Sequence, residues 1–494
     1  MAALVNPGNN MNATPAVTQS VLAENYIDFT SSTTKGWAQQ FLPELMEKEA
    51  EVFGNRSVSG FLEMVGAEEA MASDQVVWSE QGRLHLSYTG AHHASTDGTF
   101  TITKDGDGND IDAAGEAGQG IRVGDMVVIS SAAGQAKAYV TDSTTNTSAT
   151  ALSILVKSYS HDTLANAGIA LSAAVNIFVF GSEYEKGKDK RDSSNTAKFT
   201  QHSNQPIIMK DMFHVSGSDA AQIGWVEVSG EEGQSGYLWY LKAAGDTKAR
   251  FTDYCEMALI EAEKAASNSG VAGITGNLKG TEGLFAAIES RGNVVAQGDV
   301  MGALSLPDFD AMLAEFDKQG AIEEYMMFLD RTTSLAVDNM LAGQNTYGAS
   351  GSSFGVFNND ENMALNLGFE GFRRGSYDFY KSNWKYLNDK ATRGGMTAAT
   401  SNFGSTSAIA GIVNGVFVPA GVSTVYDQQL GKNLKRPFLH VRYRAAGAED
   451  RKFKTWTTGS VGASTSALDA MEMHFLTERC LVVQGANNFM LMRG

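Results

Sequence analysis

One long amphipathic repeat, over residues 235–268, constrains the fold of this chain more than any other feature. Apolar side chains recur there every three or four positions, with acidic and basic ones between them: Leu241, Ala244, Phe251, Cys255, Ala258, Leu259 and Ala262. This spacing predicts an α-helix with one face against a core, and the run SNSG is a typical helix end. At 1.5 Å per residue the helix would be roughly 50 Å long, longer than most globular helices.

Extended segments surround the predicted helix. Residues 74–88 read as a strand and residues 197–216 regain extended character, so the two could pair as a hairpin. Shorter helices are expected at 37–53, 284–290, 305–316 and from about 333 to 343, with a buried strand at 325–330. Aromatic-rich segments follow at 369–387 and 415–425, and strand-like runs end the chain at 437–443, 453–456, 470–484 and 488–492. This mixture predicts an α+β fold.

Residues 90–186 differ in composition from their surroundings. Thr, Ser, Ala, Gly and Asp dominate, and short alternating runs follow one another at 99–104, 121–130, 137–141, 152–158 and 175–180. The run IRVGDMVVI turns at Gly124-Asp125 into a β-branched strand, which is common in small β-barrels. We therefore expect an inserted, small β-barrel-like domain in the middle of the hairpin.

Length, charge and cysteine usage narrow the class of protein. A chain of 494 residues exceeds one core, so two or three units are expected, and 52 Gly against 7 Pro indicate many tight turns. A net charge of −18 argues against a uniformly attractive surface for DNA or anionic lipid. The two cysteines, Cys255 and Cys480, have no motif around them and are expected as reduced, buried thiols. No secretory signal or long apolar run is present, so we expect a cytosolic chain without a membrane segment.

Catalytic motifs are nearly absent. The match to G-x-S-x-G at residues 351–355 follows NTYGAS and precedes NNDEN, so a Ser/Gly loop is favoured over a nucleophile turn. HExxH, a Walker phosphate loop and a GxGxxG after a strand do not occur. His92 and His93 are adjacent but lack spaced partners, so a metal site there is disfavoured. We expect no enzyme, no cofactor and no resident metal.

Two further segments keep open alternatives. Residues 105–110 (DGDGND), with Glu116 eleven positions after Asp105, imitate a calcium loop but lack its required glycine, so a hairpin turn is favoured over calcium binding. The basic cluster is either a solvated hairpin tip or a contact with an acidic neighbouring subunit, and the two interpretations weigh equally: Lys186, Lys188, Lys190 and Arg191.

The order of these parts resembles the Hong Kong 97 type of major capsid protein of tailed bacteriophages. QPIIMKDMFHVSGS is similar to the returning strand of that family's E-loop, and GYLWYLKAAGDTKARFTDYCEMALIEAEKA to its spine helix. EYMMFLD resembles a P-domain strand, NGVFVPAGVSTVYD an A-domain strand and loop, and HFLTERCLVVQGANNFMLMR the closing P-domain strand pair. The resemblance spans nearly the whole chain except about 90–186, and shell proteins of larger phages, including the crAss-like group, carry such insertions.

The resemblance implies a domain scheme. Residues 1–54 would form an N-terminal arm with a short helix, 55–89 and 187–220 the E-loop hairpin, and 90–186 the inserted β domain. Residues 221–345 would form the P domain with the spine helix, 346–432 the A domain, and 433–494 the returning strands of the P domain. We expect the inserted domain on the outer surface of a shell, because it must avoid both the core and the packed genome.

The resemblance also implies partners. Identical subunits would assemble as hexamers and pentamers of an icosahedral shell, with portal, scaffolding and decoration proteins and with packaged double-stranded DNA on the inner face, without sequence-specific binding. Assembly would take place in the host bacterial cytoplasm. Candidate intersubunit contacts are Tyr26 and Phe29 of the arm together with the basic cluster. The alternatives are another virion structural protein, such as a tail tube or decoration protein, and a carbohydrate-binding or enzymatic β protein.

Overall fold

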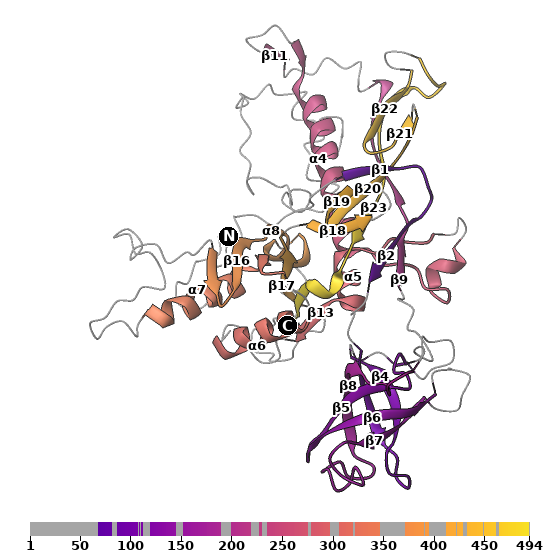
Figure 1. The fold of residues 1–494 in the computed structure, drawn as a ribbon. Helices are drawn as coiled ribbons and strands as arrows, with labels where there is room; N and C mark the ends of the chain where they lie inside the picture. Colours follow the sequence, from indigo (N-terminus) through magenta and orange to yellow (C-terminus); the bar gives the residue numbers. More distant parts are fainter. Residues whose placement is uncertain are drawn as a thin grey trace. The chain divides into compact units, whose positions relative to one another are not determined.

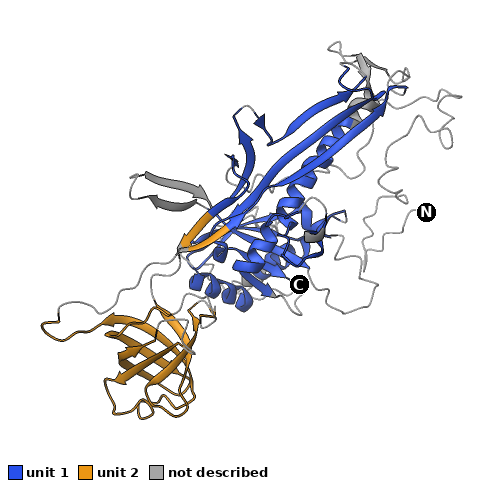
Figure 2. Cartoon of the chain, turned by 90° about the vertical axis from the view of Figure 1, so that its right-hand side faces the viewer, with its two compact units in different colours: residues 1–77, 203–494 blue, residues 78–202 orange. Residues whose placement is uncertain are grey.

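The chain divides into two compact units, seen in a computed structural model (Figures 1 and 2). The structure describes residues 68–81, 86–106, 108, 110–111, 119–144, 152–188, 199–218, 227–229, 235–274, 278–296, 306–319, 322–345, 371–389, 391–394, 412–420, 422–427, 432–447, 449–460 and 464–493. Unit 2 is the single stretch Trp78–His202, and unit 1 comprises Met1–Val77 and Ser203–Gly494. Unit 2 is therefore inserted within unit 1.

Unit 2 contains a closed six-stranded barrel in the order β3-β4-β7-β6-β5-β8. Its strands are β3 (Ser87–His92), β4 (Thr99–Asp105), β5 (Asp125–Ser131), β6 (Gln135–Ser143), β7 (Ser153–Ser158) and β8 (Ala174–Ser182). Buried and exposed positions alternate along β4 to β8, because successive side chains of a strand point to opposite faces. The predicted inserted barrel is confirmed, and its core is filled by apolar side chains such as Phe100, Ile129 and Ile177.

The turn before β5 has the chemistry that the sequence indicated. The Arg122 amide donates to a carboxylate oxygen of Asp125 at 2.8 Å, and the Asp125 amide donates to the Arg122 carbonyl at 3.1 Å. Gly124 adopts φ +92°, and a Cβ there would lie 2.7 Å from the Tyr184 ring. Only glycine fits this position without strain.

A two-stranded ribbon carries the chain into and out of the barrel. β2 (Val76–Gln81) pairs with β9 (Phe199–Asn204), as the sequence predicted for parts of residues 74–88 and 197–216. The rest of each segment pairs elsewhere: β3 closes the barrel against β4 and β8, and β10 (Ile207–Ser216) pairs with a strand near the end of the chain. Local alternation predicts a strand but does not choose between partners so far apart in the sequence.

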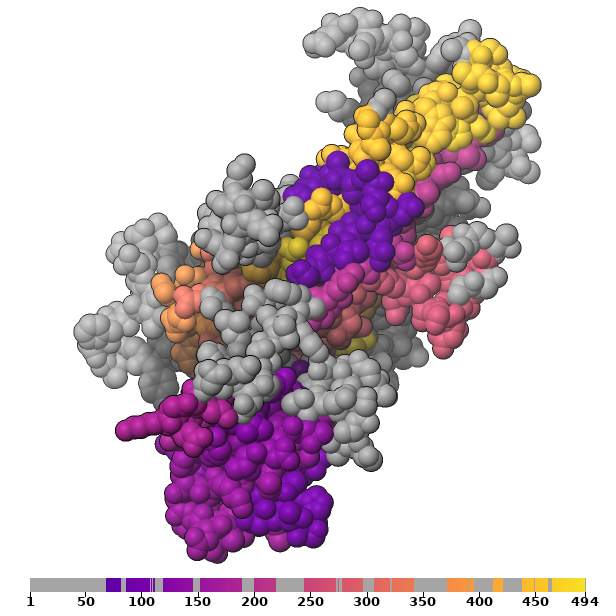
Figure 3. Space-filling model, turned by 45° about the vertical axis from the view of Figure 1, so that its right-hand side comes forward, coloured from indigo at the N-terminus to yellow at the C-terminus, as the bar shows by residue number. Residues whose placement is uncertain are grey.

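In unit 1, sheet A has the order β1-β20-β23-β10, and its longest strand is β23 (Ala470–Val483). β10 runs antiparallel along one side of β23, while β22 (Lys454–Gly459) and β20 (Leu439–Ala446) share the other side. β1 (Glu68–Met71) joins β20 in parallel, and β21 (Glu449–Asp450) pairs with the end of β20. Figure 3 shows β1 (indigo) against these C-terminal strands (yellow).

The long helix is α4 (Leu238–Glu261), which packs on sheet A. Phe251 and Cys255 of α4 form a buried cluster with Phe475 of β23. The prediction of a helix over 235–268 was too long at both ends. Residues Ser235–Tyr237 are strand β12, paired with β11 (Glu227–Ser229), and the end of the helix is replaced by a bridge between Lys264 and Gly280.

That bridge explains why the helical pattern stops early. The Ala265 amide donates to the Lys279 carbonyl at 2.8 Å, and the Gly283 amide donates to the Ala262 carbonyl at 2.8 Å. Gly280 has φ +66°, and a Cβ there would meet the Glu263 carbonyl oxygen at 2.2 Å. Pairing with a distant segment therefore overrides the helical preference of residues 262–268.

Sheet B of unit 1 has the order β13-β24-β17-β14-β16-β15. Its strands are β13 (Asn293–Ala296), β14 (Glu324–Leu329), β15 (Gly371–Arg374), β16 (Tyr377–Asn383), β17 (Val413–Pro419) and β24 (Met490–Arg493). The helices of this region are α5 (Leu284–Arg291), α6 (Leu306–Gln319), α7 (Arg331–Asn345) and α8 (Lys385–Asn388). The short helices and the buried strand predicted at 284–290, 305–316, 325–330 and 333–343 agree with α5, α6, β14 and α7. The predicted helix at 37–53 lies outside the described residues.

Each face of sheet B carries a buried core cluster. On β17, Val416 and Val418 join one core cluster with Leu284 and Ile288 of α5, whereas Phe417 joins the opposite cluster. That opposite cluster includes buried side chains of α6 and α7: Phe309, Met312, Phe316, Ala336, Val337, Met340 and Leu341. Burial on both sides explains why β14 and β17 are apolar in succession and not alternating.

The remaining elements are short. β18 (Val422–Asp427) pairs with β19 (Lys432–Pro437), and two 3-10 turns lie at η2 (Gly270–Gly273) and η5 (Ala486–Asn488). Among the described helices, none combines the length and the apolar character that crossing a membrane requires.

Candidate assembly surfaces

The histidines and acidic residues that could bind a metal have structural partners. The Gly98 amide donates to Nε2 of His92 at 3.1 Å, so Nδ1 carries the proton that is shared with the Ala170 carbonyl at 3.0 Å. His92 is buried and stacks on Phe100, with ring centroids 4.6 Å apart. In the part of the chain that the structure describes, no three His, Cys, Asp or Glu side chains gather in a way that could hold a metal ion.

The described residues of DGDGND, at positions 105, 106, 108 and 110, form a turn at the end of β4. The Gly108 amide donates to the Asp105 carbonyl at 3.1 Å, and Lys104 forms a bridge with Asp110, their charged groups 3.5 Å apart. This favours the hairpin turn expected from the sequence. The calcium alternative needs three further oxygen ligands, which lie outside the described residues: Asp107, Asn109 and Glu116. The G-x-S-x-G match at 351–355 also lies outside the described residues.

Both cysteines are free, buried thiols, as the sequence predicted. Burial raises the pKa of Cys255 to about 11 and that of Cys480 to about 12. A thiol so far from ionisation at neutral pH is a poor nucleophile, because the thiolate is the reactive form. These residues therefore serve packing and not chemistry.

An ionic clamp holds β1 on sheet A. Glu69 forms an ion pair with Arg442 of β20, with the carboxylate oxygen 2.5 Å from the guanidinium nitrogen. Glu68 forms an ion pair with Lys452, and its carboxylate lies 3.8 Å from the guanidinium of Arg479 on β23. Arg479 is buried and also donates to the Lys452 carbonyl at 2.8 Å. Charged side chains thus fix the strand with which the described part of unit 1 begins.

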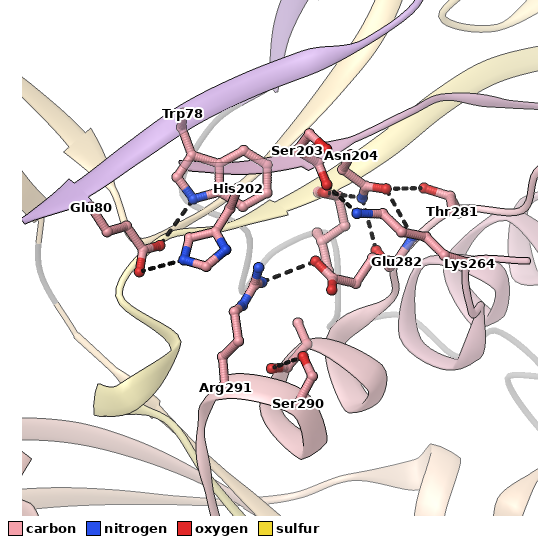
Figure 4. A network of polar contacts seen from close by, with 12 residues as sticks. Trp78, Glu80, His202, Ser203, Asn204, Lys264, Thr281, Glu282, Ser290 and Arg291 are labelled. Carbon is pink, nitrogen blue, oxygen red and sulfur yellow. Dashed lines mark hydrogen bonds and ion pairs between the residues drawn. The ribbon is translucent and has the colours of Figure 1, made fainter. Parts of the chain in front are cut away.

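A buried amide organises the point where the chain returns to unit 1 (Figure 4). Asn204, at the end of β9, donates through Nδ2 to the carbonyls of Leu481 at 2.6 Å and Glu282 at 2.9 Å. Its Oδ1 accepts from the Glu282 amide at 2.9 Å and from the Thr281 hydroxyl at 3.1 Å. Lys264 caps the same region by donating to the Ser203 carbonyl. One side chain thereby ties three separate segments together.

Within unit 2, the base of the ribbon has a polar cluster of its own (Figure 4). The indole of Trp78 donates to Glu80 at 2.9 Å, and the other carboxylate oxygen of Glu80 lies 3.6 Å from Nε2 of His202. The Trp78 and His202 rings lie 6.1 Å apart across the β2–β9 pair. These contacts fix the register at the base of the ribbon.

Sheet A turns one face toward α4 and the other away from it. We call the second the open sheet face, formed by alternate residues of β22, β23 and β10. The odd-numbered residues Met209 and Phe475 pack toward α4, so their even-numbered neighbours point away. Among these, Ile208 is 55% exposed and Met212 is 53% exposed. The exposed Lys210 lies between them on the same face, so the open sheet face presents two large apolar side chains to water next to a charged one.

Polar groups cross the open sheet face beside these apolar side chains. Glu472 lies between two histidines, 3.4 Å from His214 on β10 and 3.4 Å from His474 on its own strand. The His474 ring stacks on Trp456 of β22 at a centroid distance of 5.1 Å, and its Nε2 bonds the Thr458 hydroxyl at 2.8 Å. The face therefore combines an exposed apolar part with an ordered polar part, as contact surfaces between proteins do.

The predicted intersubunit residues are only partly described. Lys186 and Lys188 are exposed in the turn that follows β8, where the Lys188 amide donates to the Glu185 carbonyl at 3.3 Å. Four others lie outside the described residues: Tyr26, Phe29, Lys190 and Arg191. The open sheet face was not predicted from the sequence, although the alternation in IIMKDMFHVS indicates that Ile208 and Met212 share one side of a strand.

Comparisons with known proteins give structural likeness at low identity. No protein-family model and no curated protein matches the chain. The capsid of a native GTA particle is 10% identical with a TM-score of 0.38, covering 91% of this chain and 94% of that chain. A chain of Microbacterium phage Oxtober96 is 9% identical with a TM-score of 0.37, covering 93% and 98%. The capsid structure of Cyanophage P-SCSP1u is 12% identical with a TM-score of 0.32, covering 64% and 80%. At these values the function has to be inferred from the chain's own residues.

Proposed function

We propose that this chain is the major capsid protein of a tailed bacteriophage, which self-assembles into the icosahedral shell around the double-stranded DNA genome. The open sheet face is the observation that supports this most. Ile208 and Met212 leave about half of their surface in water on a long sheet whose other face packs against α4 at β10 and β23. A protein whose function is contact with identical copies requires such a face, because each interface in a shell can be weak when it is repeated many times.

The arrangement of the units supports a Hong Kong 97-like assignment of the parts. In this proposal the β2–β9 ribbon is the E-loop (55–89 and 187–220), the barrel is its inserted domain (90–186), and α4 is the spine helix. Residues 221–345 and 433–494 form the P domain and 346–432 the A domain, with residues 1–54 as the arm. Sheet B joins these ranges, since β14, β17 and β24 come from one range each.

The partners follow from this role. Subunits form hexamers and pentamers, and portal, scaffolding and decoration proteins complete the particle, which assembles in the host bacterial cytoplasm and can belong to a crAss-like or a similar phage. A net charge of −18 suits an inner face that repels phosphate weakly and holds DNA without reading its sequence. The inserted barrel then faces outward, and Tyr26, Phe29 and the basic cluster contact neighbouring subunits.

Electron microscopy of the purified full chain tests the proposal. Closed shells, open sheets of capsomers or capsomer rings are the expected products. A chain that stays monomeric at high protein concentration and in high salt would contradict the proposal. Regular tubes would favour the alternative of a tail tube protein.

A paired variant tests the role of the open sheet face. Ile208→Ser/Met212→Ser should abolish or strongly reduce particle formation, and it should change the free energy of unfolding by less than about 0.5 kcal/mol per site, as surface substitutions do. Leu335→Ser on α7 is the matched control, since Leu335 is 51% exposed and lies elsewhere in unit 1. Normal particles from the paired variant, counted by microscopy and light scattering, would remove the main support for the proposal.

A further inference from the structure

The outer surface of the barrel has an apolar patch that its own fold does not use. On β8, Phe178 is 45% exposed and Phe180 is 43% exposed, and their ring centroids lie 6.5 Å apart. The register places Val128 of β5 beside Phe178, and Met126 of β5 beside Tyr139 of β6. Directly paired residues share one face of a sheet, so these side chains form a continuous group. We call it the barrel patch: Met126, Val128, Tyr139, Phe178 and Phe180.

A β-bulge lies within this patch. The pairing of β5 with β8 shifts between Met126 and Val127, so Phe180 and Gly181 together oppose Met126. Gly181 leaves room for the methionine, whose Cε lies 2.9 Å from where a Cβ would stand. Phe178 and Phe180 share the outer face through the ordinary alternation of β8, and glycine at position 181 lets the Met126 side chain approach β8 closely.

The position of the patch is unusual for a small barrel. The interior is already filled by its own apolar side chains, such as Ile129 and Ile177 of the same two strands. Outward positions of a barrel in water are ordinarily polar, and adjacent exposed aromatic residues indicate a contact surface. Since the six strands close, an added strand has no edge to pair with, and the contact must be made through side chains.

We infer that the barrel patch joins the barrels of neighbouring copies of this chain in the assembled shell, an inference that rests on the proposed function. Its size favours a second copy over an independent partner. Taking about 200 Å² per phenylalanine, the two rings leave roughly 180 Å² exposed. A stable pair of free proteins buries about 800 Å² on each partner. A patch this small holds two surfaces together only where a larger assembly already brings them close.

The charges around the patch are compatible with self-association. Lys137 is exposed and lies in the same cross-strand row as Val128 and Phe178. Glu183 is exposed one residue beyond the end of β8, where it accepts the Tyr159 hydroxyl at 2.6 Å. A twofold contact presents the same surface from both sides, so it can set Lys137 of one copy against Glu183 of the other. A surface with both signs of charge complements itself.

Cross-linking in assembled particles tests this inference directly. Both native cysteines are buried, so Phe180→Cys adds an accessible thiol to the full chain. Mild oxidation or a short bismaleimide should produce disulfide- or linker-joined dimers from shells but not from dissociated subunits. Leu171→Cys is the matched control, because Leu171 is 43% exposed on a turn of the same unit outside the patch. It should give no dimers.

A stability measurement tests the energetic role of the patch. Phe178→Ser/Phe180→Ser should lower the guanidinium concentration at which shells dissociate, whereas Leu171→Ser should leave it unchanged, and the barrel's own thermal transition should stay in place in both. Two results together would overturn the inference and leave the proposed function intact. The thiol of Phe180→Cys would react fully with a bulky maleimide in assembled shells, and Phe178→Ser/Phe180→Ser would not change the guanidinium concentration at which shells dissociate. A wild-type chain that never forms shells overturns the proposed function and the inference with it.

Discussion

The two units of this chain bury their apolar strands in different ways: unit 2 in a closed barrel and unit 1 in open sheets. The barrel closes on itself, so β3 and β8, the first and last of its strands, pair with each other. Unit 1 leaves its sheets open: sheet A ends at β1 and β10, and sheet B at β13 and β15. A closed barrel completes its core alone, whereas an open sheet leaves surface for other chains. We therefore expect unit 2 to fold on its own, and in the proposed shell unit 1 provides most of the surface for contacts between copies.

Truncating the centre of the barrel should produce the largest effect and should break the chain into two thermal transitions. Phe100 is fully buried and stacks on His92, so Phe100→Ala should destabilise unit 2 by about 3–5 kcal/mol. Calorimetry of the full chain should show only the barrel transition moving to lower temperature. Phe178→Ala, at an exposed position of the same unit, is the control, and an equal shift of both transitions in Phe100→Ala would show that the units fold as one.

Unit 1 can be destabilised separately from the barrel by removing one member of a buried ion pair. Lys381 of β16 pairs with Asp338 of α7, and their side chains are only 6% and 10% exposed. Asp338→Asn leaves the ammonium buried without its counter-charge, which should cost about 3–5 kcal/mol in denaturant unfolding of unit 1. The exposed pair of Arg373 and Asp378 provides the control, Asp378→Asn, which should change little. Replacing both members as Lys381→Met/Asp338→Leu should recover most of the loss, and no recovery would contradict this account.

The junction between the units can be weakened through Asn204. Asn204→Ala removes the partner of two carbonyls, one amide and one hydroxyl, so we expect a loss of about 3 kcal/mol from the groups left unsatisfied. Hydrogen exchange should increase around Thr281, Glu282 and Leu481 while the barrel remains protected. Asn176→Ala, on the exposed side of β8, serves as the control. Faster exchange spread evenly through the barrel would argue against a role confined to the junction.

The smallest expected effect is a pH dependence of unit 1. Two hydrogen bonds from Arg374, at 2.9 and 2.8 Å, lower the pKa of Asp310 below its usual value. A lowered pKa contributes stability above the unfolded value near 3.9, and that contribution disappears as the pH falls through the folded pKa. Because the pair is nearly half exposed, Asp310→Asn should cost less than about 1 kcal/mol at pH 6, and this cost should shrink as the pH falls through the folded pKa of Asp310. An equal loss at every pH would assign the effect to packing.

The sequence predicted the barrel better than the pairing of the open sheets. Four of its strands were expected within two residues of their bounds, because alternation between a filled interior and water is a local signal. β3 was missed as a barrel strand. One of its two partners is β8, and the paired residues Tyr88 and Ile177 are 89 positions apart, which no local pattern can predict. β10 and β23 were both predicted as strands, but their pairing with each other was not.

The candidate contact residues were harder to predict. Lys186 and Lys188 stood out because like charges cluster visibly in a sequence, whereas Phe178 and Phe180 are separated by one residue in a run that suits a buried strand equally well. Alternation places both rings on one face of β8, but only the pairing of β8 with β3 and β5 in the closed barrel decides that this face is the outer one. Asn204 gave no signal at all, since its importance comes from Thr281, Glu282 and Leu481, which reach it from distant segments.

The ribbon of β2 and β9 gives the insertion a property that concerns evolution and engineering. Neighbouring strands lie about 5 Å apart, so the chain leaves unit 1 and re-enters it at almost the same point. At such a junction, one domain can be replaced by another whose N- and C-termini lie close together, and the path of the remaining polypeptide does not have to change. Lineages can thus gain, lose or trade the module, and, in the proposed shell, a designer can display an enzyme or an antigen at this position once per subunit.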